Sequence, residues 1–274
     1  MTVVVKIGGA KAVDPAGAIG DIADLVDDGE PVTVVHGGST AVDDLLARLG
    51  IDPTYVETPN GVVGRFTDEA TMEAFTMAMG HVNSDLVATF REAGVDAVGL
   101  SGVDGGLVTG PRKSAVRVID DGKKKIKRGD HSGKIESVNA DLLETLLSDG
   151  YTPVAGPPML ADDGVPVNTD ADRAAAAVAG ALGATLVVLT DVSGVYADPD
   201  DPSTLIESVA TPDEYDALTD AAEGFMTKKI MAATEALASG ASEVVVADAN
   251  VDAPVTAALG GSGTHIHRSA LEDL

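Results

Sequence analysis

The stretch VVVKIGG at residues 3–9 is a run of mostly β-branched residues that ends in two glycines, and VVHGG at residues 34–38 repeats the pattern. Short apolar runs bounded by glycine are typical of buried strands. Residues 15–27, which lie between the two runs, are rich in Ala, Ile and Asp and predict a helix. Together these segments indicate a βα unit of a mainly parallel sheet.

The same alternation continues along the chain of 274 residues. It predicts strands at 2–7, 31–35, 95–100, 152–155, 185–190 and 243–247. It predicts helices at 15–27, 39–48, 68–92, 139–148, 170–182 and 226–238. The fold class is therefore α/β, and a boundary near residue 172 divides an amino-terminal lobe, 1–172, from a carboxyl-terminal lobe, 173–274.

Residues 105–134 interrupt this alternation, because short β-like pieces lie on either side of Asp121-Gly122. An Asp-Gly pair in such a setting predicts a hairpin, which we expect to be inserted into the wound sheet. The segment from Arg112 to Lys134 is also strongly basic. It holds nine of the 18 Lys and Arg residues of the chain and only three acidic ones.

The formal net charge is −26, which is extreme for a folded enzyme. Self-repulsion at this charge is costly in dilute salt, but at ~1 M salt the Debye length is only ~3 Å. Because the acidic residues are spread along a sequence that keeps its apolar periodicity, disorder does not explain them. The charge therefore predicts a halophilic, salt-rich cytoplasm, and it argues against a nucleic acid partner.

Composition also bears on compartment. No run approaches the ~18 apolar residues of a membrane span, and Met1 leads into a predicted strand without a charged leader, so we expect a cytoplasmic protein with no membrane partner. The chain has no cysteine, which excludes disulfides, thiolate catalysis and Cys-based zinc sites.

Paired glycines at strand ends suit phosphate binding, because backbone amides approach oxygens closely where there is no Cβ. Lys6 adds positive charge beside Gly8 and Gly9, although a tight turn with a solvent-facing lysine is the alternative. Neither glycine loop matches the P-loop or dinucleotide pattern. His36 is expected to be a structural hydrogen-bonding residue rather than a base.

Two further motifs add polar groups to this lobe. Arg65 precedes a predicted helix, where its guanidinium either clamps a substrate carboxylate in a bidentate pair or forms a surface ion pair. Asn168 and Asp172 lie four residues apart near the start of another helix. The amide of Asn168 is suited to binding substrate, and the carboxylate of Asp172 is suited to orienting cationic groups. Helix capping explains Asp170 better.

The carboxyl-terminal lobe holds two motifs that suit a nucleotide. LTDVSGVY at residues 189–196 is a strand end that turns through glycine. GFMTKKI at residues 224–230 begins a helix with two adjacent lysines. Cations at a helix amino-terminus oppose the macrodipole, so an anion is expected nearby.

In their order and spacing these motifs resemble those of the amino acid kinase family, especially its N-acetylglutamate kinase branch, over nearly the whole chain. The resemblance implies a three-layer αβα sandwich, with an acceptor-binding amino-terminal lobe and an ATP-binding carboxyl-terminal lobe. It implies ATP as co-substrate and Mg²⁺ as cofactor, with no metal-binding residue assigned. It also suggests a homodimer.

The resemblance carries over to individual residues. Lys6 and Lys229 match the two lysines that neutralise the transferring phosphoryl group, Gly8 and Gly37 offer it backbone amides, and Asp172 organises the lysines. The implied acceptor contacts are Gly37, Gly38, Arg65 and Asn168. The implied ATP contacts are Gly9, Thr190, Asp191, Gly194 and Tyr196.

The match to the family motifs is incomplete at two positions. Lys229, not Lys228, has the G-x-M-x-x-K spacing from Gly224, but Phe225 replaces the second glycine of that motif. Ser39 replaces a third glycine after the histidine. The implied chemistry needs no general base, since the acceptor carboxylate is already ionised; catalysis is in-line positioning plus charge neutralisation.

The basic segment is similar to that of kinases acting on amino acids attached to an acidic amino-group carrier protein (LysW-type). The similarity rests on RKSAVRVID at 112–120, GKI at 133–135 and GRFTDE at 64–69. It implies carrier-linked glutamate or 2-aminoadipate as acceptor, in arginine or lysine synthesis, because a small free amino acid cannot use nine cations. The residues expected to dock the carrier are Arg112, Lys113, Arg117, Lys123, Lys124, Lys125, Lys127 and Arg128.

Other hypotheses remain. The first is an N-acetylglutamate kinase that acts on the free molecule. Carbamate, uridylate and aspartate kinases share the implied fold but give the hairpin no role. A catalytically inactive nucleotide sensor is disfavoured by Lys6, Asp172 and Lys229, and an NAD-linked oxidoreductase by the missing glycine fingerprint.

Overall fold

The computed structural model describes residues 1–8, 15–59, 61, 63–120, 122–222 and 224–271. In this part of the chain the larger of two sheets has eleven strands. They are β1 (Val3–Ile7), β2 (Val32–His36), β5 (Ala97–Gly102), β6 (Val108–Gly110), β9 (Ser137–Val138), β10 (Thr152–Ala161), β11 (Pro166–Val167), β12 (Thr185–Thr190), β13 (Ser208–Val209), β14 (Glu243–Asp248) and β15 (Thr264–His267). The order is β13-β15-β14-β12-β1-β2-β10-β6-β9, with β5 and β11 also paired to β10, and most pairings are parallel.

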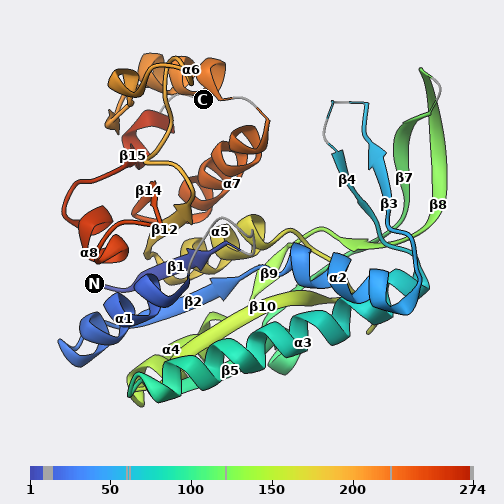
Figure 1. The fold of residues 1–274 in the computed structure, drawn as a ribbon, viewed down its shortest axis with the longest axis horizontal. Helices are drawn as coiled ribbons and strands as arrows, with labels where there is room; N and C mark the ends of the chain where they lie inside the picture. The colour runs from blue at the N-terminus through green and yellow to red at the C-terminus, as the bar shows by residue number, and fades with distance from the viewer. Residues whose placement is uncertain (9–14, 60, 62, 121, 223, 272–274) are drawn as a thin grey trace.

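Helices cover both faces of this sheet (Figure 1). They are α1 (Pro15–Asp27), α2 (Ser39–Leu49), α3 (Glu69–Glu92), α4 (Ala140–Ser148), α5 (Ala171–Leu182), α6 (Pro212–Ala221), α7 (Phe225–Ser239) and α8 (Pro254–Leu259). Because side chains alternate across a strand, Val3 and Val5 of β1 pack with α1, α3 and α8, whereas Val4 packs with α5 and α7. The three-layer αβα sandwich is confirmed.

The two halves of the chain share the large sheet. β1 pairs with β12 in parallel from Val3 opposite Thr185 to Lys6 opposite Val188. The expected boundary near residue 172 falls in the first turn of α5 and does not interrupt the sheet. The assignment of one half to the acceptor and the other to ATP stays a prediction.

A second, four-stranded sheet stands beside the sandwich (Figure 1). Its order is β4-β3-β7-β8, from β3 (Thr54–Glu57), β4 (Val63–Phe66), β7 (Arg112–Asp120) and β8 (Lys123–Gly133). The predicted hairpin is present as β7 and β8, but it is not an isolated insertion, since β3 pairs with it. Residues 106–110 were also expected in the hairpin; buried Leu107 and Val108 instead join the main core through β6.

The six predicted strands and six predicted helices are all present, and their ends agree within two residues except at one strand. The expected strand at 152–155 runs on to Ala161, because after Pro157-Pro158 it finds new partners in β6 and β11. The helices α6 and α8 were not predicted. No helix within the described ranges is long and apolar enough to span a membrane.

Candidate active site

The alternation of side chains along β1 determines which way Lys6 points. Lys6 lies on the same face of β1 as Val4, which is the face covered by α5, and it is only 6% exposed. The first turn of α5 brings Asp172 to it. This helix begins at Ala171 because the Asp170 carboxylate accepts hydrogen bonds from the backbone N–H groups of Asp172 and Arg173, at 2.9 and 3.1 Å. Capping is therefore the role of Asp170.

Asp172 forms ion pairs with both predicted lysines. Its Oδ1 lies 2.6 Å from Nζ of Lys6, and its Oδ2 lies 3.5 Å from Nζ of Lys229. Burial raises the pKa of the Asp172 carboxyl, but the charges of Lys6 and Lys229 outweigh burial and hold that pKa below its usual range. The side chain is therefore a carboxylate at neutral pH.

Lys229 is also perturbed. Burial and the charge of Lys6 lower the pKa of Lys229, and the attraction of Asp172 offsets this only in part. Two ammonium groups on one carboxylate leave a positive charge uncompensated by this cluster. Such a site favours a further anion, such as a transferring phosphoryl group.

These groups line a cavity of about 1150 Å³. Ten of the predicted catalytic, acceptor and ATP residues line it together: Lys6, Gly8, Gly37, Gly38, Arg65, Asn168, Asp172, Thr190, Asp191 and Lys229. Segments far apart in the sequence thus meet at one site. A cavity of this size can hold a nucleotide beside a small acceptor.

Two of the expected ATP contacts, Gly194 and Tyr196, do not line this cavity. Gly194 packs against a neighbouring strand, where a Cβ would lie 2.5 Å from Oγ1 of Thr264. Tyr196 forms a β-bridge with Leu205. Gly9 lies outside the described residues. The glycine turn at 194 therefore serves close packing in this structure.

The glycine loop after β2, at Gly37 and Gly38, packs against buried side chains of β2 and α3. His36 is buried, its Nε2 lies 3.0 Å from Nδ2 of Asn83, and its Nδ1 lies 3.2 Å from the carbonyl oxygen of Gly37. Burial lowers the pKa of His36, which agrees with a structural rather than a basic role. A Cβ on Gly38 would lie 2.7 Å from Sδ of Met79, so the loop packs tightly on α3.

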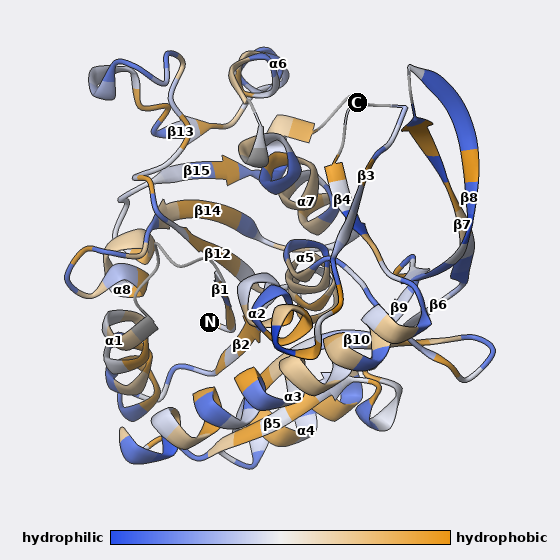
Figure 2. Ribbon diagram, turned by 45° about the vertical axis from the view of Figure 1, so that its right-hand side comes forward, coloured by the Kyte–Doolittle hydropathy of each residue, from blue (hydrophilic) through white to orange (hydrophobic). Residues whose placement is uncertain are grey.

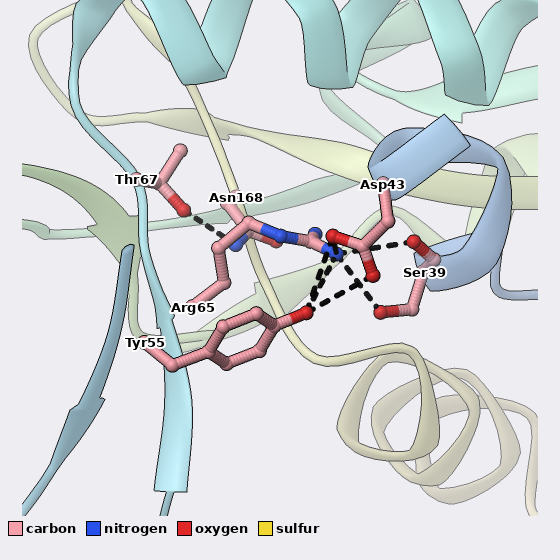
Figure 3. Close-up of polar contacts among 6 residues, drawn as sticks. All are labelled: Ser39, Asp43, Tyr55, Arg65, Thr67 and Asn168. Atoms are coloured by element: carbon pink, nitrogen blue, oxygen red, sulfur yellow. Dashed lines mark hydrogen bonds and ion pairs between the residues drawn. The ribbon is translucent and has the colours of Figure 1, made fainter. Parts of the chain in front are cut away.

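Arg65 is held in a polar cluster that the sequence did not predict (Figure 3). Its Nη2 donates to Oδ1 of Asp43 at 2.7 Å and to the carbonyl and hydroxyl oxygens of Ser39 at 3.0 and 3.1 Å. Tyr55 donates to the same carboxylate at 3.0 Å. The side chain of Arg65 is 7% exposed, and its Nε is buried without a hydrogen-bond partner among the described residues. Arg65 therefore forms an ion pair with Asp43 at the wall of the cavity, and its contact with an acceptor carboxylate stays a prediction.

Asn168 is tied to the second sheet. Its Nδ2 donates to Oγ1 of Thr67 at 2.9 Å (Figure 3), and its backbone pairs with His131 and Gly133 of β8. Thr67, in turn, donates its N–H to the buried carboxylate of Asp130. The cavity wall and the basic hairpin are therefore one hydrogen-bonded unit.

The eight predicted docking residues are all on β7 and β8. Seven are exposed, and Lys127 is partly covered because its Nζ lies 4.1 Å from the ring centre of Phe66. Lys113 also lines the cavity. Over most of its length β8 is hydrophilic (Figure 2), so the outer strand of this sheet is a water-facing basic surface.

A metal ion at this site would be held partly by the phosphates of the nucleotide. The described residues contain no group of three or more His, Cys, Asp or Glu arranged to hold one. Asp170 and Asp191 line the cavity, and Mg²⁺ is commonly held by substrate phosphates with one or two carboxylates and water. These residues fit a magnesium ion that arrives with ATP.

Named relatives align with nearly the whole chain. It is 42% identical over 264 residues to a [LysW]-aminoadipate kinase of Deinococcus radiodurans, covering 96% of this chain and 90% of that protein. It is 42% identical over 269 residues to a [LysW]-aminoadipate kinase of Thermus thermophilus, covering 96% and 98%. It is also 41% identical to an acetylglutamate kinase of Methanopyrus kandleri, covering 89% and 93%.

Among solved structures, N-acetylglutamate synthase from Neisseria gonorrhoeae, complexed with coenzyme A and N-acetyl-glutamate, has a TM-score of 0.76 and 26% identity. The match covers 97% of this chain and 59% of that one. A profile described as the amino acid kinase family matches residues 1–248. The chain therefore belongs to the amino acid kinase family and is a phosphotransferase.

Proposed function

We propose that the enzyme transfers the γ-phosphoryl group of ATP to the side-chain carboxylate of glutamate or 2-aminoadipate attached to an amino-group carrier protein. A carboxylate oxygen attacks the γ-phosphorus, a bond forms between them, and the bond to the ADP oxygen breaks. The products are an acyl phosphate and ADP. No proton is transferred, because the acceptor is already ionised.

The observation that carries this proposal is the buried cluster of Lys6, Asp172 and Lys229 at the end of β1. Phosphoryl transfer spreads negative charge over the equatorial oxygens, and preorganised cations and amides stabilise that charge. Lys6 and Lys229 supply the cations, Asp172 fixes their positions, and Gly8 and Gly37 supply amides. Bound Mg²⁺ would add further charge neutralisation on the nucleotide phosphates.

The acceptor would bind on the second-sheet side of the cavity. Arg65 is proposed to hold the α-carboxylate through the nitrogen atoms that its neighbours leave unused. Gly37, Gly38 and Asn168 would contact the rest of the amino acid. On the other side, Thr190 and Asp191 are proposed to lie along ATP, whereas Gly194 and Tyr196 would need to act from outside the cavity.

The carrier is supported by the basic hairpin and by the names of the relatives in Deinococcus and Thermus. With such a carrier, we propose that the reaction belongs to arginine or lysine synthesis. The net charge of −26 supports a salt-rich cytoplasm as the working environment. We also propose a homodimer, which size-exclusion chromatography with light scattering would test.

A second candidate is phosphorylation of free N-acetylglutamate, which the relative in Methanopyrus kandleri favours. ATP consumption in multimolar KCl separates the two, with hydroxylamine to trap the acyl phosphate. The acceptors are N-acetylglutamate, carrier-linked glutamate and carrier-linked aminoadipate. Turnover confined to carrier-linked acceptors supports the carrier, and efficient turnover of N-acetylglutamate alone overturns it.

A further inference from the structure

The basic hairpin has two faces with different surroundings. In paired strands, residues directly opposite one another share a face. Arg117 is opposite Ile126, and Ile119 is opposite Lys124. Arg128 is opposite Ala115 and lies on the same face. We name this face the cavity face; it carries Ala115, Arg117, Ile119, Lys124, Ile126 and Arg128.

The cavity face continues onto the strands that carry the acceptor residues. Ile119 of β7 is opposite Glu57 of β3, and Tyr55, two residues earlier on β3, is opposite Arg65 of β4. Alternation therefore places Arg65 and Tyr55, which line the cavity, on the same face of the sheet as the first set.

The opposite, or rear, face consists of Val116, Val118, Asp120, Lys123, Lys125 and Lys127. The position of Lys127 over the ring of Phe66 confirms the division, because Phe66 follows Arg65 in β4 and points the other way. Val118 is buried on this face, and Lys125 is neutralised by Asp120 at 2.6 Å. On the rear face, therefore, some side chains are packed against neighbours and Lys125 is paired with a carboxylate.

The cavity face instead exposes both charge and apolar surface. Arg117, Lys124 and Arg128 are exposed on it, and Ile126 is 66% exposed among them. Glu57 is the acidic residue that this face holds on β3. An exposed isoleucine surrounded by cations is the arrangement of a protein-docking surface, with an apolar anchor inside a charged rim.

We infer that the carrier docks on the cavity face alone, with Ile126 as its apolar anchor and with Arg117, Lys124 and Arg128 as its contacts to carboxylates. This inference removes Lys123, Lys125 and Lys127, which lie on the rear face, from the eight predicted docking residues. This inference rests on the proposed function. Neighbouring strands are ~4.8 Å apart, so this face extends about 14 Å from β4 to β8. An acidic carrier seated there needs about four extended residues, at ~3.3 Å each, to deliver its terminal amino acid to Arg65.

The test compares equal charge changes on the two faces of the full-length enzyme. The cavity-face variants are Arg117→Gln, Lys124→Gln and Arg128→Gln, singly and combined, together with Ile126→Ser. The matched rear-face controls are Lys123→Gln, Lys125→Gln and Lys127→Gln, also singly and combined. We measure KM and kcat for carrier-linked glutamate and carrier-linked aminoadipate, and the KM for ATP, in multimolar KCl.

The combined cavity-face variant should raise the carrier KM ~30-fold, and Ile126→Ser about tenfold, with kcat and the KM for ATP unchanged. The rear-face controls should stay within about twofold. Equal effects on the two faces, with the wild-type enzyme active on the carrier, would overturn the face assignment alone. Wild-type turnover of free N-acetylglutamate only would overturn the proposed function, and this inference with it.

Discussion

Nη2 of Arg65 lies 2.7 Å from Oδ1 of Asp43, and the same nitrogen donates to the carbonyl and hydroxyl oxygens of Ser39. Asp43 and Tyr55 therefore hold Arg65 in place while its Nε stays without a hydrogen-bond partner in the described structure. A guanidinium fixed in this way binds a carboxylate with less loss of side-chain entropy.

Replacing Asp43 by Asn should consequently weaken acceptor binding without removing Arg65. The acceptor KM should rise about tenfold, which corresponds to ~1.4 kcal/mol, with kcat and the KM for ATP little changed. Steady-state kinetics measures this. In an Arg65→Lys background the same substitution should add under twofold, and a full additional tenfold would show that Asp43 acts independently of Arg65.

Lys229 and Lys228 are adjacent, and Nζ of Lys229 lies 3.5 Å from Oδ2 of Asp172. Nζ of Lys228 instead donates to the carbonyl oxygen of Val63 at 2.7 Å. Lys229→Met should therefore lower kcat by ~100-fold or more, since it removes a charge that stabilises the transition state. Lys228→Met makes the same charge change and should cost less than tenfold. The reverse ranking would assign the catalytic role to Lys228.

Asp172 also sets the basic limb of the pH profile. Burial and the charge of Lys6 lower the pKa of Lys229, and Asp172 is the group that raises it. Asp172→Asn should lower the pKa of Lys229 further, so the active ammonium form is lost at lower pH. We expect the fall of kcat on the alkaline side to begin at lower pH in the variant. A profile that shifts to higher pH would contradict this electrostatic role.

His36 should make folding sensitive to mild acid. Burial lowers the pKa of His36, so between the unfolded value of ~6.5 and the lower folded value only the unfolded chain binds the proton. The unfolding free energy then falls as the pH falls, by at most ~1.4 kcal/mol per pH unit for this group. His36→Asn should flatten this slope in denaturant titrations between about pH 5 and 6.5, below the unfolded pKa of ~6.5.

Local pattern predicted the central strands, whereas the cluster of Lys6, Asp172 and Lys229 was expected from the family resemblance. In the fold, Lys6 lies on the face of β1 that α5 covers and Asp172 lies in the first turn of α5, so strand parity and helix phase direct them to each other. The cluster around Arg65 was missed, because its partners Asp43 and Tyr55 lie on another helix and strand, 22 and 10 residues away. Only tertiary pairing brings them together.

The second sheet was also only partly predictable from local sequence. The strand Thr54–Glu57 is mostly exposed, so it carries no alternation of apolar and polar residues that a pattern could detect. The turn at Gly194 was expected to contact ATP from the family resemblance. In the structure it packs closely against Thr264, and its contact with ATP stays a prediction.

The pairing of β1 with β12 has a consequence for synthesis of the protein. β1 sits between β12 and β2, so one of its edges stays open until residue 190 has left the ribosome. A nascent chain therefore carries an unpaired edge of Val3, Val4 and Val5 until β12 has been made, in a topology dominated by distant contacts. The strand that presents Lys6 is made long before the strand that completes its pairing.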